Sequence, residues 1–149
     1  MNEKRLLAEA IAEAKLGLSE GGIPIGAILA DFEGNIISRG HNLRVQTDDP
    51  TAHAEVVCIR NAGRRTDWRK LVLASTLSPC IMCTGTSLLY RIPKIIIGEN
   101  LTFQGAEALF AANGVECVVL DNAECIEMMR SFIKAQPDVW NEDIGVPED

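Results

Sequence analysis

The sequence predicts a single domain with a three-layer α/β/α fold, in which helices cover both faces of a five-stranded mixed sheet. Three observations support this prediction. The chain has 149 residues, a length that suits one domain with its own core. It begins with a helical repeat of apolar residues, followed by two short apolar runs that resemble a hairpin. From residue 52 onward helices and strands alternate, which is typical of strands that pair in parallel.

The first predicted helix is the clearest. Apolar residues between Leu6 and Leu18 recur at three- and four-residue spacing, and Gly21-Gly22 ends the pattern. A later helix is predicted to open with Ser78 as its N-cap and Pro79 at its first position. The five predicted helices cover residues 3–19, 52–63, 80–90, 105–112 and 123–135.

The predicted strands are short apolar runs bounded by turn residues. The first two flank a turn that contains Gly34, so we expect them to form a hairpin. The polar segment 41–50 is predicted to be a loop, and the acidic tail from residue 137 carries apolar residues that a disordered tail usually lacks. The five predicted strands cover residues 25–30, 36–39, 71–75, 95–97 and 115–120.

The composition favours a cytoplasmic protein that binds neither nucleic acid nor membranes. A net charge of −7 opposes binding to a polyanion, because phosphate contacts need clustered Lys and Arg. No apolar segment has the length of a signal peptide core or a membrane span. The one basic run is interpreted as a solvated helix end and loop; it consists of Arg60, Arg64, Arg65, Arg69 and Lys70.

The five cysteines are expected to be core residues or metal ligands, because disulfides are rare in a reducing compartment. Cys58, Cys117 and Cys125 fall in apolar helix and strand positions and are predicted to lie in the core. Cys80 and Cys83 are three residues apart at the start of a predicted helix. Their side chains therefore share one helix face and can bind one ion.

His53 is predicted to supply a third ligand from another helix N-terminus. Three protein ligands leave a position open for water, as in catalytic zinc sites, whereas structural sites are usually closed by four. Glu55 is expected to act as the proton shuttle, since a carboxylate beside the metal can accept a proton from an activated water and deliver it to the substrate. The combination of H-x-E with P-C-x-x-C is typical of zinc deaminases. The alternatives are a structural zinc site completed by His41 or Cys58, and a redox pair without metal.

Several further motifs resemble one family over nearly the whole chain. The chain resembles the cytidine and deoxycytidylate deaminase superfamily, and within it the fungal type of cytosine deaminase. The zinc motif is shared by the superfamily, whereas the tail and the Gly-His-Asn segment are narrower signals. The matching segments are residues 21–26, 39–42, 76–80, 82–85, 97–100, Phe103 and the tail segment 140–145.

The resemblance implies a homodimer with one zinc per subunit and assigns residues to the substrate. Asn42 and Asp143 would recognise the polar edge of the base, Phe103 and Trp140 would stack on or close over the ring, and the backbone of Ala54 and Ser78 would line the pocket. The residues alone leave other roles open, since Asn42 could be a turn residue and Asp143 a solvated tail charge. Ala54 stands where the fungal enzymes carry glycine.

The predicted function is the hydrolytic deamination of a free base, most simply cytosine to uracil plus ammonia. The tail, residues 137–149, is expected to fold over the site and exclude ribose. The alternatives are another amino-heterocycle such as guanine or isocytosine, a nucleoside or tRNA substrate, and a zinc-stabilised binding module without activity.

Overall fold

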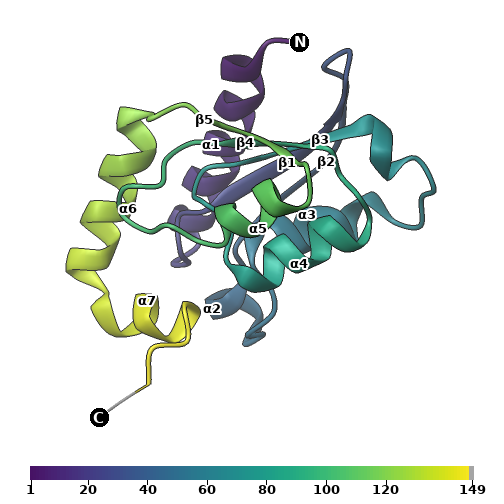
Figure 1. Cartoon of the computed structure of the whole chain (residues 1–149). Coiled ribbons are helices and arrows are strands. Elements are labelled where there is room, and N and C mark those ends of the chain that lie inside the picture. The colour runs from purple at the N-terminus through teal and green to yellow at the C-terminus, as the bar shows by residue number, and fades with distance from the viewer. Residues whose placement is uncertain (148–149) are drawn as a thin grey trace.

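The computed structural model describes residues 1–147 and confirms the three-layer α/β/α fold (Figure 1). The five strands lie in the order β2-β1-β3-β4-β5. β1 pairs antiparallel with both β2 and β3, whereas β3, β4 and β5 are parallel, so the sheet is mixed. The strands are β1 (Gly26–Asp31), β2 (Ile36–His41), β3 (Leu71–Ser75), β4 (Lys94–Ile97) and β5 (Glu116–Val119).

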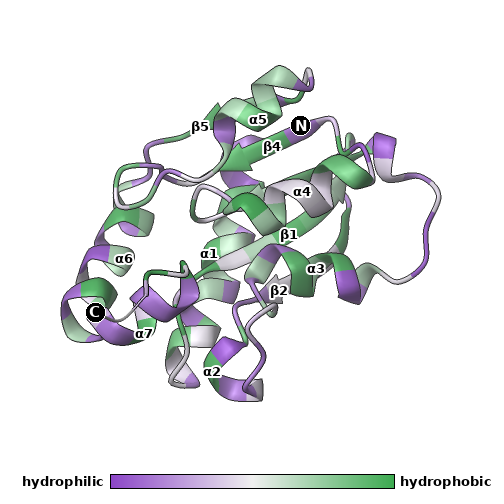
Figure 2. Ribbon diagram, turned by 60° about the horizontal axis from the view of Figure 1, so that its bottom comes forward, coloured by the Kyte–Doolittle hydropathy of each residue, from purple (hydrophilic) through white to green (hydrophobic). Residues whose placement is uncertain are grey.

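Helices pack on both faces of this sheet, and the first of them has the predicted boundaries. The helix α1 (Glu3–Ser19) covers one face, with the start of α6 (Ala123–Ala135) beside it. The opposite face carries α3 (Ala54–Ala62), α4 (Ile81–Leu89) and α5 (Glu107–Ala112) (Figure 1). Two further helices, α2 (Arg44–Thr47) and α7 (Pro137–Asp143), lie close together at one end of the domain (Figure 1 and Figure 2).

Alternating residues of the central strands build two separate cores. Leu29 and Leu73 belong to the cluster beneath α3, whereas Ile28 and Val72 belong to the cluster beneath α1. This alternation follows from the two-residue period of a strand. Figure 2 shows β4 coloured mainly as hydrophobic, and its residues 95–97 are fully buried. Burial on both faces fixes the register of the strands, since a one-residue slip would exchange the two cores.

Several element boundaries differ from the prediction. The loop expected over residues 41–50 contains the four-residue helix α2, and the tail folds into α7. The prediction that Ser78 caps a helix was wrong, because α4 begins at Ile81 and has Cys80 as its N-cap. The hydroxyl of Ser78 instead donates to the Glu107 carboxylate at 2.6 Å, so it does not cap the helix.

A glycine allows α3 to approach the sheet closely. A Cβ atom at Gly40 would lie 2.5 Å from the backbone nitrogen of Cys58, so any larger residue would push α3 away from β2. Cys58 and Cys125 are buried, as predicted, and Cys117 is half-buried. Among the described residues, no helix has both the length and the apolar character needed to cross a membrane.

Candidate metal centre and active site

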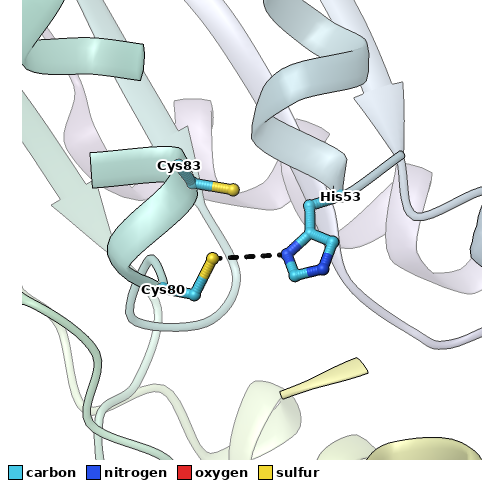
Figure 3. Close-up of side chains that lie close together, drawn as sticks. All are labelled: His53, Cys80 and Cys83. Carbon is cyan, nitrogen blue, oxygen red and sulfur yellow. Dashed lines mark hydrogen bonds between the residues drawn. The ribbon is translucent and has the colours of Figure 1, made fainter. Parts of the chain in front are cut away.

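The N-terminal ends of α3 and α4 bring three potential metal ligands together. His53 is the N-cap of α3, Cys80 is the N-cap of α4, and Cys83 lies in the first turn of α4. Figure 3 shows their side chains pointing toward one another across the gap between the two helices. His53 Nδ1 lies 3.4 Å from Cys80 Sγ, and the three donor atoms lie within 4.8 Å of one another.

This donor set fits a zinc ion with one open coordination position. Bonds of about 2.3 Å to sulfur and about 2.0 Å to nitrogen place the donors of a tetrahedral site about 3.5 Å apart. The observed spacing therefore requires only small side-chain movements. Neither of the alternative fourth ligands is available: Cys58 bonds to Ser38, and His41 bonds to Glu13 and Glu20. The site has the three protein ligands expected of a catalytic zinc centre.

The two cysteines have very different proton affinities before metal binds. A hydrogen bond from Cys83 lowers the pKa of Cys80 to about 4, despite the opposing effect of burial. The same hydrogen bond, together with burial, raises the pKa of Cys83 well above its usual value. Cys80 is therefore a thiolate at neutral pH and is ready to bind a cation, since the thiolate is the metal-binding form.

His53 is held in position by a carboxylate from the other end of the chain. Its Nδ1 faces Cys80, and its Nε2 lies 3.2 Å from Asp143 Oδ1. Burial acts to lower the pKa of His53, because it disfavours the charged ring. The hydrogen bonds to Asp143 and Cys80 outweigh burial and raise the pKa of His53 to about 10. A carboxylate on the second ring nitrogen fixes the tautomer of a ligating histidine and strengthens it as a ligand.

We expect Asp143→Ala to weaken zinc binding about 10- to 100-fold, because the outer partner of His53 is lost. Competition with a coloured zinc chelator measures this change. The matched control is Asp138→Ala, since Asp138 lies on the same helix and is exposed. Equal zinc affinities in the two variants would refute the proposed role of Asp143 in holding His53.

Glu55 is a buried carboxylate beside the three ligands and does not belong to the ligand group. Only 4% of its surface is exposed, and it lies in the first turn of α3. Burial and the neighbouring Cys80 thiolate raise the pKa of Glu55 to about 7, although His53 acts in the opposite direction. A carboxyl group with a pKa near neutrality can both accept and donate a proton, as a general acid and base must.

A small cavity lies next to these groups. Its volume is about 20 Å³, which is room for about one water molecule. Its walls include nine of the ten residues that the sequence assigned to the site, Cys83 being the exception. The complete lining is Ile25, Asn42, His53, Ala54, Glu55, Leu77, Ser78, Cys80, Phe103, Trp140, Asp143 and Ile144.

Asn42 and Asp143 are joined although 101 positions separate them in the chain. The amide nitrogen of Asn42 donates to both carboxylate oxygens of Asp143, at 3.3 and 3.2 Å. The amide oxygen of Asn42 accepts a hydrogen bond from the backbone nitrogen of Arg44 at 2.9 Å. Asn42 is therefore a turn residue that also lines the cavity, and its contact with the base stays a prediction.

The two aromatic residues meet at the cavity. The rings of Phe103 and Trp140 lie edge to face, with centroids 5.7 Å apart. Sequence reasoning did not assign three apolar residues that complete the wall, Ile25, Leu77 and Ile144. Nothing in their local sequence distinguishes them from ordinary core residues, since each one's role follows from the packing of the tail and strands around the site.

Comparison with known proteins agrees with this geometry. The sequence pattern of the cytidine and deoxycytidylate deaminase zinc-binding region matches residues 1–99. A cytosine deaminase from Candida albicans is 43% identical over 146 residues, covering 97% of each chain. A tRNA-specific adenosine deaminase from Streptococcus pyogenes is 40% identical over 108 residues, covering 70% of this chain and 67% of its own.

A solved structure from a study of tRNA:A34 deaminases, which edit adenosine to inosine at the wobble position of transfer RNA, superposes with a TM-score of 0.71. The two sequences are 28% identical, and the match covers 84% of this chain and 99% of that chain. The pattern match over two thirds of the sequence and the full-length relative lead to one conclusion: this chain belongs to the cytidine and deoxycytidylate deaminase family.

Proposed function

We propose that this chain hydrolyses cytosine to uracil and ammonia. The observation that carries the proposal is the buried carboxylate of Glu55, which lines one cavity with the ligands His53 and Cys80. The relative that matches along nearly the whole chain is a cytosine deaminase. The relatives that act on tRNA match over a shorter part, and the net charge of −7 opposes a nucleic-acid substrate.

Glu55 moves the protons of this reaction. Zinc held by His53, Cys80 and Cys83 would polarise the attacking water. Glu55 takes a proton from that water while the water oxygen bonds to C4 of the base. Glu55 then delivers the proton to ring N3. The bond from C4 to the exocyclic nitrogen then breaks, and the amine leaves as ammonia after a second proton transfer through Glu55.

The other walls of the cavity hold the base. Asn42 and Asp143 line the same cavity and would bind the polar edge of the ring in place of their bond to each other. Ala54 and Ser78 also line the cavity, and their backbone would contact the ring. Phe103 and Trp140 would stack on or close over its faces.

The tail, residues 137–149, acts as a cover that excludes ribose. Residues 148–149 lie outside the described part of the chain, but α7 carries both Trp140 and Asp143 into the cavity wall. A cavity with room for about one water molecule must widen to admit a pyrimidine, and we propose that α7 moves to widen it. Once α7 closes again, no space remains for a sugar on the ring.

The test is a panel of substrates assayed for ammonia release by the zinc-loaded protein. We expect turnover of cytosine, with cytidine at least about 100-fold poorer because a closed apolar wall meets the sugar. Guanine, isocytosine and a tRNA substrate complete the panel. Faster turnover of any of these than of cytosine would overturn the proposed substrate without overturning hydrolytic deamination.

We also propose that the chain works as a homodimer in the cytoplasm, in the salvage of pyrimidines. Large apolar side chains on α4 and in the loop that follows β4 are exposed, namely Ile81, Leu89 and Leu101. Burial against a second copy would remove them from water. Sedimentation should then give twice the chain mass of 16.2 kDa, and a monomeric mass at micromolar concentration would contradict the proposal. A reducing cytoplasm keeps the ligand cysteines reduced, so that they can bind metal.

A further inference from the structure

Two loops that carry cavity residues are joined by a dense set of hydrogen bonds. We call residues 78–80, which end at the ligand Cys80, the metal loop, and residues 100–106, which contain Phe103, the Phe103 loop. The backbone nitrogen of Ala106 donates to Pro79 O at 3.1 Å, and that of Gly105 donates to Ser78 Oγ at 3.0 Å. A Cβ atom at Gly105 would lie 1.8 Å from Pro79 O, so only glycine permits this contact.

One carboxylate connects both loops. Glu107, the first residue of α5, accepts the hydroxyl proton of Ser78 at 2.6 Å through Oε2. Its Oε1 accepts from the side-chain amide of Asn100 at 3.2 Å. Ser78 therefore donates to Glu107 and accepts from Gly105 at the same time, which fixes the orientation of its hydroxyl. Hydrogen bonds to an ionised group are stronger than those between neutral groups.

A second carboxylate holds the other end of the Phe103 loop. Glu99 is fully buried, and its side chain accepts from the backbone nitrogens of Leu101 and Thr102 at 2.7 and 2.9 Å. The hydroxyl of Thr102 also bonds to it. The backbone carbonyl of Glu99 accepts from Ser78 N at 3.0 Å, so this end is tied to the metal loop as well. Phe103 is thus supported on both sides.

We infer that Glu107 is a positioning residue for deamination: it locks the Phe103 wall of the base pocket to the loop that presents Cys80. It touches neither the base cavity nor the ligand group. Its effect passes through Ser78 to Cys80 and through Asn100 to Phe103. The inference rests on the proposed function for its effect on the base, but its effect on the metal loop is independent of any substrate.

The experiment compares Glu107→Ala with Glu124→Ala. Glu124 also lies in the first turn of a helix, α6, and pairs at 2.6 Å with exposed Lys15. We expect Glu107→Ala to raise KM for cytosine about tenfold, with kcat lowered less than about threefold. Zinc should remain bound at one ion per chain but pass to a chelator about tenfold faster. Glu124→Ala should leave KM and the rate of zinc loss at wild-type values.

A double-mutant cycle with Ser78→Ala shows whether the two residues act through each other. Ser78→Ala removes one oxygen and should reproduce much of the change in KM and in the rate of zinc loss. In the double variant, both quantities should change no more than in the more affected single variant. Glu107→Gln keeps an acceptor for the hydroxyl and should restore most of the wild-type KM. If Glu107→Ala does not fold, Ser78→Ala provides the same readouts.

Three results would overturn the inference: wild-type KM and zinc-loss rate in both single variants, effects that multiply in the double variant, or equal effects of Glu107→Ala and Glu124→Ala. If the wild-type protein fails to deaminate cytosine, the proposed function fails. The rate of zinc loss then still decides whether Glu107 secures the metal loop, because that measurement needs no substrate.

Discussion

Replacing Glu55 with glutamine is expected to lower kcat for cytosine by about 10³- to 10⁴-fold while leaving zinc bound. The amide has nearly the shape of the carboxylate but cannot accept the proton from the attacking water. General acid–base catalysis typically contributes factors of about 10² to 10⁴, and Glu55 handles protons at several points of this reaction. A loss near the upper end of that range is therefore expected.

The measurement pairs steady-state kinetics with zinc content determined by mass spectrometry. Glu33→Gln is the matched control, because Glu33 is an exposed carboxylate in a turn. KM should change little in Glu55→Gln, since the residues that hold the base are intact. A Glu55→Gln protein with full zinc and more than about a tenth of wild-type kcat would show that another group transfers the protons.

Replacing Cys83 with serine is expected to weaken zinc binding severely and to lower turnover with it. The Cys83 side chain is fully buried at the metal site, so the hydroxyl would occupy the same place as a much poorer ligand. A site of this kind draws binding free energy from each ligand, and we expect zinc affinity to fall about 100-fold or more. Thermal stability in the presence of zinc should fall as well, because the metal links α3 and α4.

Cys117→Ser separates loss of a ligand from loss of a thiol. Cys117 is half-buried on β5 and is outside the ligand group, so this variant should retain one zinc per chain and normal kcat. Zinc content and melting temperature are measured for both variants. If Cys83→Ser bound zinc as tightly as Cys117→Ser, the assignment of Cys83 as a ligand would be wrong.

The metal centre could be predicted from the sequence because its signals are local. Cys80 and Cys83 are one helical turn apart, and His53 and Glu55 are separated by one residue. The fold could be predicted for a related reason, since the continuous burial of β1, β3 and β4 appears directly in their apolar runs.

The walls of the cavity could not be predicted in the same way. Asp143 bonds to Asn42 and His53 only because α7 returns to the site from the far end of the chain. No local sequence pattern encodes a contact between residues so far apart in the chain. Ser78 illustrates the opposite error: its position before Pro79 matches a helix cap, but a stronger partner, the Glu107 carboxylate, is available in the fold.

The proposed chemistry depends on one metal ion serving one hydrolytic site. The most direct test is to titrate the metal-free protein with zinc and follow the formation of uracil from cytosine. We predict that the rate rises in proportion to added zinc and stops rising at one zinc per chain. Uracil formation by metal-free protein, or no uracil formation at one zinc per chain, would contradict the account.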